Sequence, residues 1–143
     1  MTVFLQDQEA TEQFGAHLWA ALPRKCVIFL QGELGMGKTT LVRGFLRAAG
    51  YSGTVKSPTY TLVEEYTLGT CQVVHFDLYR LVDPEELEDL GIRDYFEQES
   101  ICFIEWPEQG GSLLPTPDLV LQFQAEQAGR DLTVNVLNNR LKI

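Results

Sequence analysis

The sequence has few basic residues, few cysteines and no long apolar run. Eleven lysines and arginines stand against twenty acidic residues, which gives a net charge of −9. A nucleic-acid-binding surface needs clustered basic residues that neutralise phosphates, so a dedicated site for DNA or RNA is not expected. No run of 18 apolar residues occurs, and the chain is therefore not expected to span a membrane.

The cysteines and the first residues bear on the cellular compartment. Cys26, Cys71 and Cys102 lie far apart and form no C-x-x-C pair of the metal-binding type. Each lies in an apolar segment, which favours buried free thiols and a reducing compartment. The N-terminus carries no basic region and only a short apolar stretch, unlike a secretion signal. We therefore expect a cytoplasmic protein.

The first part of the sequence has the pattern of an α/β fold. The length fits one domain, 1–143, around one hydrophobic core. Apolar residues recur every fourth position over 8–21 and predict a helix, with Asp7 as its N-cap. A short apolar run at 27–30 is typical of a strand buried on both faces, and a helical pattern follows over 41–47.

The second part is rich in strand patterns. Asp83 and Pro84 predict the start of a helix that stops at Gly91. Five further strands are predicted at 61–67, 71–76, 100–106, 119–124 and 132–137. The first two of them form a hairpin through Leu68-Gly69-Thr70, and the last two form an antiparallel pair around Gly129.

The segment between the first predicted strand and the helix at 41–47 carries a phosphate-binding motif. Gly32, Gly37, Lys38 and Thr39 fit G-x-x-x-x-G-K-[ST] completely. The glycines permit backbone angles that aim successive N–H groups at anionic oxygens, and the helix adds the positive end of its dipole. The motif predicts a P-loop nucleotide-binding fold, in which a mixed, partly antiparallel sheet is flanked by helices.

The side chains of this loop have separate expected roles. Lys38 places its charge against the β- and γ-phosphates of ATP, and we expect it to be solvated when no ligand is bound. Thr39 offers a hydroxyl to Mg²⁺, and Thr40 can reach an α-phosphate oxygen. The expected cofactors are therefore ATP and Mg²⁺.

Two acids are candidates for the metal site. Glu105 and Asp77 each follow an apolar strand, at the end where open α/β sheets bind ligands. Either could hold Mg²⁺ directly or through water, and Glu105 is the favoured ligand. Thr59, after Pro58, is either part of an ordinary turn or a hydroxyl available to a γ-phosphate. His75 is interpreted as a structural residue rather than a base.

Four segments together resemble the TsaE family, also called YjeE, bacterial P-loop ATPases of tRNA threonylcarbamoyladenosine biosynthesis. The segments are GELGMGKTT at 32–40, SPTYT at 57–61, HFDLYRL at 75–81 and EWPE at 105–108. The order of these four motifs in so short a chain is specific to the family, and the resemblance covers essentially the whole sequence.

The resemblance implies site residues. Thr39 and Glu105 would ligate Mg²⁺, Lys38 and Asp77 would serve catalysis with Glu105, and Thr59 would act in a switch-like loop. Trp106, which alone could equally be a core residue, would lie near the nucleotide. The remaining implied nucleotide contacts are in the loop and around the adenosine: Gly35, Met36, Gly37, Thr40, Gln8, Gly129 and Arg130.

The resemblance also implies protein partners, TsaB and TsaD, and contact with tRNA only through their complex. ATP hydrolysis would be slow alone and would reset that complex between cycles. Two other functions stay open, a small-molecule kinase and a GTP-type switch. The sequence lacks the arginine-rich lid of many kinases and the N-K-x-D segment that reads guanine, so both are less favoured.

Overall fold

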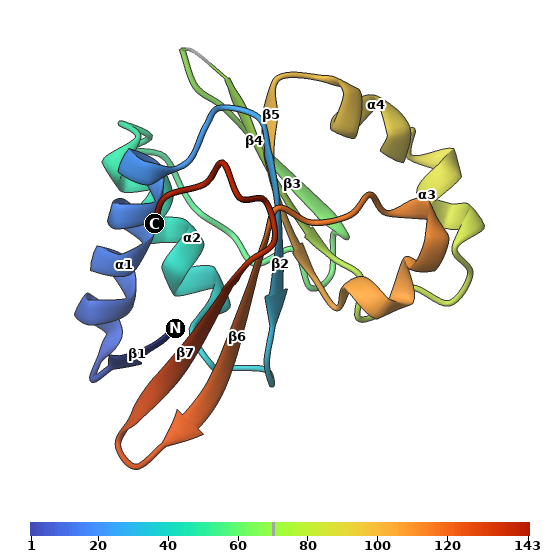
Figure 1. Cartoon of the computed structure of the whole chain (residues 1–143). Coiled ribbons are helices and arrows are strands. Elements are labelled where there is room, and N and C mark those ends of the chain that lie inside the picture. Colours follow the sequence, from blue (N-terminus) through green and yellow to red (C-terminus); the bar gives the residue numbers. More distant parts are fainter. Residues whose placement is uncertain (70) are drawn as a thin grey trace.

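The sheet of this protein contains both parallel and antiparallel strand pairs. The first strand of the chain pairs with the last one. In the computed structural model, which describes residues 1–69 and 71–143, the described residues form seven strands in the order β1-β7-β6-β2-β5-β4-β3 (Figure 1). The strands are β1 (Thr2–Leu5), β2 (Cys26–Gln31), β3 (Val63–Thr67), β4 (Gln72–Asp77), β5 (Ser100–Glu105), β6 (Leu119–Glu126) and β7 (Gly129–Val136). The predicted α/β class with a partly antiparallel sheet is confirmed.

The centre of the sheet is parallel and its edges are antiparallel. β2 pairs in parallel with β5 on one side and with β6 on the other, and β4 pairs in parallel with β5. β3, β7 and β1 complete the sheet through antiparallel pairs. The apolar runs of β2, β4 and β5 suit this position, because parallel strands are covered on both faces.

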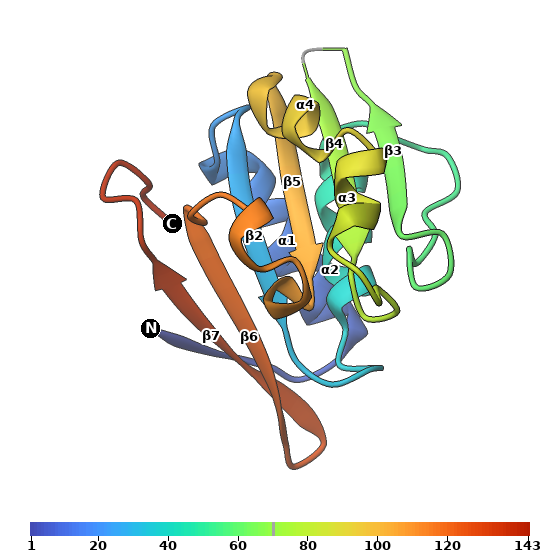
Figure 2. The same cartoon turned by 90° about the vertical axis from the view of Figure 1, so that its right-hand side faces the viewer.

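Helices cover both faces of the sheet, as Figures 1 and 2 show. α1 (Gln8–Ala21) and α2 (Lys38–Ala48) lie side by side on one face, and α3 (Glu85–Asp89) and α4 (Ile92–Glu97) lie on the other. The predicted N-cap of α1 is confirmed, because the Asp7 Oδ1 accepts a 2.8 Å hydrogen bond from the Ala10 N–H.

The predicted cap at Asp83 lies one residue before the one observed. Pro84 occupies the cap position of α3 and already has helical backbone angles. Asp83 still satisfies the helix start, because its Oδ1 accepts from the Glu85 N–H at 3.0 Å. In return, the Glu86 carboxylate accepts from the Asp83 N–H at 3.1 Å, which completes a reciprocal capping box.

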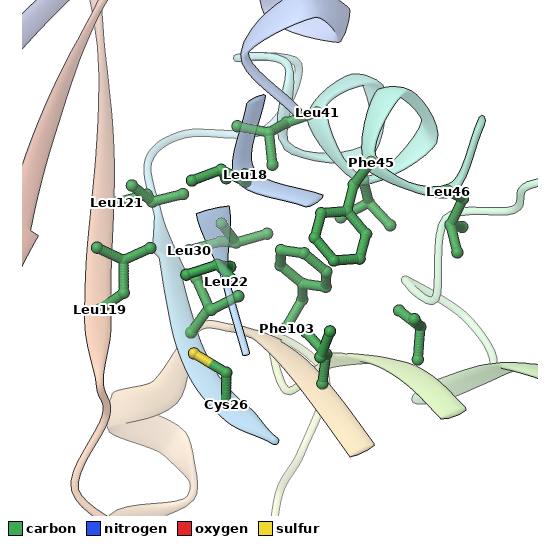
Figure 3. Packing of buried hydrophobic residues seen from close by; sticks show 14 of the residues in the cluster. Leu18, Leu22, Cys26, Leu30, Leu41, Phe45, Leu46, Phe103, Leu119 and Leu121 are labelled. Carbon is green, nitrogen blue, oxygen red and sulfur yellow. The ribbon is translucent and has the colours of Figure 1, made fainter. Parts of the chain in front are cut away.

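The larger core lies between the α1–α2 pair and the sheet (Figure 3). There the rings of Phe45 from α2 and Phe103 from β5 meet edge to face, with centroids 5.0 Å apart. The two helices approach closely at two glycines. A Cβ on Gly15 would lie 2.2 Å from the Leu41 carbonyl oxygen, and one on Gly44 would lie 2.1 Å from that of Glu12. This close contact fixes α2, and with it the loop that precedes it.

Besides two short 3-10 helices, η1 (Pro107–Gln109) and η2 (Gly111–Leu113), the described residues form one strand and one α-helix that the sequence patterns do not predict. β1 is a four-residue strand, and α4 is a six-residue helix that begins after Gly91, whose φ is +74°. Both are too short to show a clear period. β4 begins at Gln72 rather than at residue 71, and Thr70 of the predicted hairpin lies outside the described residues. No helix in 1–69 or 71–143 is long and apolar enough to cross a membrane.

Candidate phosphate-binding site

The glycine loop joins the central strand β2 to the start of α2. Gly32 and Gly37 have φ angles of +139° and +108°, and Gly35 has +80°, a region that favours glycine. A Cβ at Gly32 would also lie 3.0 Å from the Phe123 Cβ. Because α2 begins at Lys38, its first backbone N–H groups have no partner within the helix and are available to a ligand.

Lys38 is buried, which contradicts the expectation that it is solvated without a ligand. Only 4% of the residue is exposed. Its Nζ donates to the Gly32 carbonyl oxygen at 2.6 Å and lies 3.3 Å from the Glu105 Oε1. The ammonium group also lies 5.1 Å from the centre of the Trp106 ring. The sequence could not predict these contacts, because they depend on the place of β5 beside β2.

The two candidate acids lie next to each other. β4 and β5 run in parallel, and their register pairs Asp77 directly with Glu105. Both residues are buried, at 1% and 3% exposure. The Asp77 Oδ2 accepts a 3.2 Å hydrogen bond from the Thr59 hydroxyl, and its Oδ1 accepts from the Tyr79 N–H at 3.0 Å. The strand-end positions therefore bring the acids together at one edge of the sheet.

Glu105 has a second close partner in His75. The His75 Nε2 lies 2.6 Å from the Glu105 Oε2, while the Glu105 Oε1 faces Lys38. Burial by itself raises the pKa of the Glu105 carboxyl. The hydrogen bond and charge of His75, together with the charge of Lys38, outweigh that effect and leave the pKa below its ordinary value. Glu105 is thus held as a carboxylate.

Two cavities adjoin the phosphate loop and share Gly35, Gly37 and Thr40 in their walls. The first has a volume of about 360 Å³ and the second about 250 Å³. Besides the shared residues, the first is lined by Leu5, Gln6, Asp7, Gln8, Thr11, Met36, Ala128, Gly129 and Arg130. The second is lined by Leu34, Lys38, Thr39, Ser57, Thr59 and Glu105. We refer to these two cavities together as the groove over the loop.

Arg130 connects the last hairpin to the phosphate loop. Its Nε donates to the Met36 carbonyl oxygen at 3.2 Å, and its Nη2 donates to that of Gly35 at 3.3 Å. Gly129 lies close to β1, since a Cβ there would be 2.6 Å from the Leu5 carbonyl oxygen. Gln8 from the N-terminal part of the chain and Gly129 and Arg130 from the C-terminal part therefore line the same cavity as the loop.

Trp106 lies beside Lys38, which forms the buried ion pair with Glu105. It has a left-handed backbone with φ +55°, and its ring packs against that of Tyr79 at a centroid distance of 5.0 Å. Its indole Nε1 is buried and finds no hydrogen-bond partner among the described residues. Arg80 points elsewhere, because its guanidinium lies 4.3 Å from the centre of the Tyr60 ring.

The residues at the second cavity fit a magnesium ion. Thr39 and Glu105 line the same cavity and offer a hydroxyl and a carboxylate, the oxygen ligands that Mg²⁺ prefers. The described part of the chain contains no group of three or more His, Cys, Asp or Glu side chains that could cage a metal. Two protein ligands can suffice for Mg²⁺, because this ion usually retains waters and binds substrate phosphates as well.

The fold and site define a class of protein: a P-loop α/β protein whose glycine loop follows the central strand β2 and whose two acids end β5 and β4. The family model "Threonylcarbamoyl adenosine biosynthesis protein TsaE" matches residues 5–132. The chain belongs to the TsaE family, whose role is in tRNA threonylcarbamoyladenosine biosynthesis.

Individual relatives agree with this family. The tRNA threonylcarbamoyladenosine biosynthesis protein TsaE of Haemophilus influenzae is 44% identical over 97% of this chain and 91% of its own length. The protein of the same name in Bacillus subtilis is 38% identical over 82% of this chain and 73% of its own length. The crystal structure of Bacillus subtilis YdiB superposes with a TM-score of 0.82 at 27% identity, covering 98% of this chain and 87% of that one.

Proposed function

We propose that this chain binds ATP with Mg²⁺ and hydrolyses it as the ATPase of the threonylcarbamoyladenosine machinery. In this proposal it acts on the TsaB–TsaD complex in the cytoplasm and meets tRNA only through that complex. The family supports the biosynthetic role, and the groove over the phosphate loop supports the nucleotide.

One observation carries the proposal: Lys38 and Glu105 form a buried ion pair in the wall of the cavity that the first turn of α2 faces. An ammonium group beside open helix N–H groups is an anion site. An arriving phosphate offers Lys38 a new partner, and the Glu105 Oε1 then becomes free for a cation. When bound, Mg²⁺ would neutralise charge on the phosphates, held by Thr39 and Glu105.

The two cavities divide the nucleotide between them in this proposal. The triphosphate occupies the cavity that contains Lys38, Thr39 and Thr59, and Thr40 reaches an α-phosphate oxygen. The adenosine occupies the first cavity, against Gln8 and Met36, where Gly129 and Arg130 close it. Arg130 steadies the loop through its hydrogen bonds to Gly35 and Met36.

Hydrolysis would depend on the groups at the far end of the phosphates. The Thr59 hydroxyl borders the cavity and donates to Asp77, which itself is buried. We propose that Asp77 holds Thr59 in place, so that the loop around Thr59 responds to the terminal phosphate. Trp106 packs beside Lys38.

The test is calorimetric titration with ATP and GTP, with and without Mg²⁺, followed by an assay of phosphate release without added acceptor. The proposal expects tight binding of ATP, much weaker binding of GTP, and slow release of phosphate. A preference for GTP would favour the switch alternative. ADP formation that needs an added acceptor and releases no inorganic phosphate would favour a kinase.

A further inference from the structure

His75 is a buried polar residue that takes no part in the groove itself. It is 0% exposed, and the groove wall on this side is formed by Glu105. It lies on β4 two residues before Asp77, so the two side chains project from the same face of the strand. That face is the one that α2 and the phosphate loop cover, because the neighbouring Val73 and Phe103 belong to the α1–α2 core.

The hydrogen bond between His75 and Glu105 is short, and His75 is its donor. A carboxylate can only accept, so the His75 Nε2 at 2.6 Å carries the proton and donates it to the Oε2. The other ring nitrogen, Nδ1, is buried without a hydrogen-bond partner among the described residues. The ring also makes an edge-to-face contact with Phe103, with centroids 6.4 Å apart. Glu105 is therefore the polar partner that the described structure gives this imidazole.

The two oxygens of Glu105 are thus divided between two partners. Oε2 is held by His75 from within the sheet, and Oε1 faces Lys38 at 3.3 Å on the side of the cavity. In the proposed function, Lys38 turns from Glu105 to a phosphate. Once Lys38 turns to a phosphate, His75 is the remaining contact that keeps the carboxylate in one orientation.

We propose that His75 is a positioning residue for the metal site: by occupying Oε2 it presents Oε1 of Glu105 to the Mg²⁺ that accompanies the nucleotide. The inference rests on the proposed function, since it needs a nucleotide-bound metal at Glu105. Partners that orient a metal ligand commonly contribute about 10- to 100-fold to metal affinity. His75 itself touches neither metal nor nucleotide in this arrangement.

The test uses variants that differ in how far the side chain reaches. His75→Gln places an amide N–H near the position of Nε2, His75→Asn is too short to reach Oε2, and His75→Met has no donor. For each, the Kd of a non-hydrolysable ATP analogue is measured by calorimetry with Mg²⁺ and with EDTA. The ratio of the two Kd values gives the enhancement of binding by Mg²⁺, and thermal unfolding checks the fold.

We expect His75→Asn and His75→Met to lose about tenfold or more of the Mg²⁺ enhancement while the Kd in EDTA changes little. His75→Gln should retain most of it. A role in packing alone would change both Kd values together or only the thermal stability. If His75→Met does not fold, the comparison of Gln with Asn still decides. An Asn variant with the full wild-type enhancement would overturn the inference.

The failure of this inference and that of the proposed function look different. If the wild-type protein does not bind the analogue in either condition, the nucleotide site itself is wrong. If the wild type binds with a clear Mg²⁺ enhancement that every His75 variant keeps, only the positioning role is wrong.

Discussion

At the scale of single residues, Lys38 and Glu105 already form an ion pair in the structure without a ligand. Lys38 and Glu105 are both nearly excluded from solvent and lie 3.3 Å apart. Removing one member of a buried charge pair leaves the other poorly compensated. We therefore expect the two side chains to depend on each other in the free protein, and in the proposed function they also bind the nucleotide and its metal.

For Lys38→Ala we expect loss of both functions. Glu105 would retain His75 alone, so the free energy of unfolding should fall by about 1–3 kcal/mol, and ATP binding should be abolished. Urea denaturation followed by circular dichroism and calorimetric titration measure the two effects. Lys25→Ala, which removes an exposed lysine, is the matched control. Unchanged stability of a well-folded Lys38→Ala protein would mean that the ion pair does not stabilise the free state.

Two buried thiols give the protein a pH dependence in the alkaline range. Burial, with the nearby charge of Asp118 as a second cause, raises the pKa of Cys26 from 9.0 to about 12. Burial likewise raises the pKa of Cys102 from 9.0 to about 11. A raised pKa keeps the folded thiol protonated, so its contribution is complete below pH 9 and is lost as the pH rises from 9 toward these values.

We predict that wild-type stability falls more steeply between pH 8 and 10.5 than that of a Cys26→Ala, Cys102→Ala double variant. The difference should be on the order of 1–2 kcal/mol per thiol. Urea denaturation at the two pH values measures it, and the double variant controls for the lysines and tyrosines that titrate in the same range. Parallel losses in both proteins would show that ionisation of these thiols is not coupled to unfolding.

At the scale of elements, the packing of α1 on α2 decides where the phosphate loop lies. Gly44 allows this contact, because an added Cβ would lie 2.1 Å from the Glu12 carbonyl oxygen. In an isolated helix, Gly→Ala gains about 1 kcal/mol. Here the clash is with backbone atoms that cannot move aside without shifting α1.

Gly44→Ala should therefore destabilise the protein, by about 1–3 kcal/mol net, despite the gain in helix propensity. Thermal unfolding measures the change, and Arg43→Ala, one position earlier on α2, is the control for propensity alone. A Gly44→Ala protein that is as stable as the wild type would mean that the helices can separate at little cost.

The helix α3 and the residues just before it carry an acidic surface. Asp83, Glu85, Glu86, Glu88 and Asp89 are all exposed. Glu86 caps the helix through the Val82 and Asp83 N–H groups, and Glu88 pairs with Arg93 at 2.9 Å. Glu85 and Asp89 are consequently the residues whose charge can be reversed with least damage to the helix.

If this surface docks on a basic region of the partner complex, Glu85→Lys with Asp89→Lys should reduce partner-stimulated ATP hydrolysis several-fold without changing the basal rate. Reversal of rim charges acts mainly on association, so the effect should weaken at high salt. Glu97→Lys with Glu99→Lys is the matched control. These exposed residues precede the first residue of β5, whereas Glu105 of the site is its last residue. An equal effect of both pairs would remove α3 from the interface.

At the scale of the whole molecule, the site is assembled from segments far apart in the sequence. The phosphate loop could be predicted because its function is local: spacing, glycines and the flanking strand and helix are all visible in 27–47. Glu105 and Asp77 could be proposed as acids at the ends of strands. Their direct pairing could not be predicted, because it depends on the register of β4 against β5.

Other contacts in the site cannot be predicted from any local sequence pattern. The hydrogen bonds from Arg130 to Gly35 and Met36 join residues more than 90 positions apart, and the resemblance to a family, rather than any spacing, pointed to Arg130. The burial of Lys38 and the contact of His75 with Glu105 likewise follow from strand order. An alternating apolar and polar pattern places a side chain on a face but does not identify the neighbour it meets there.

The most direct test of the central claim is a steady-state assay of phosphate release from ATP with Mg²⁺, with and without the TsaB–TsaD complex. A group supplied by a partner can accelerate P-loop hydrolysis by roughly 10³–10⁵. Arg80, three residues after Asp77, lies against Tyr60 instead of the phosphate cavity. We therefore predict slow release by this chain alone and a marked acceleration by the complex. Equal rates with and without a demonstrably bound complex would contradict the account.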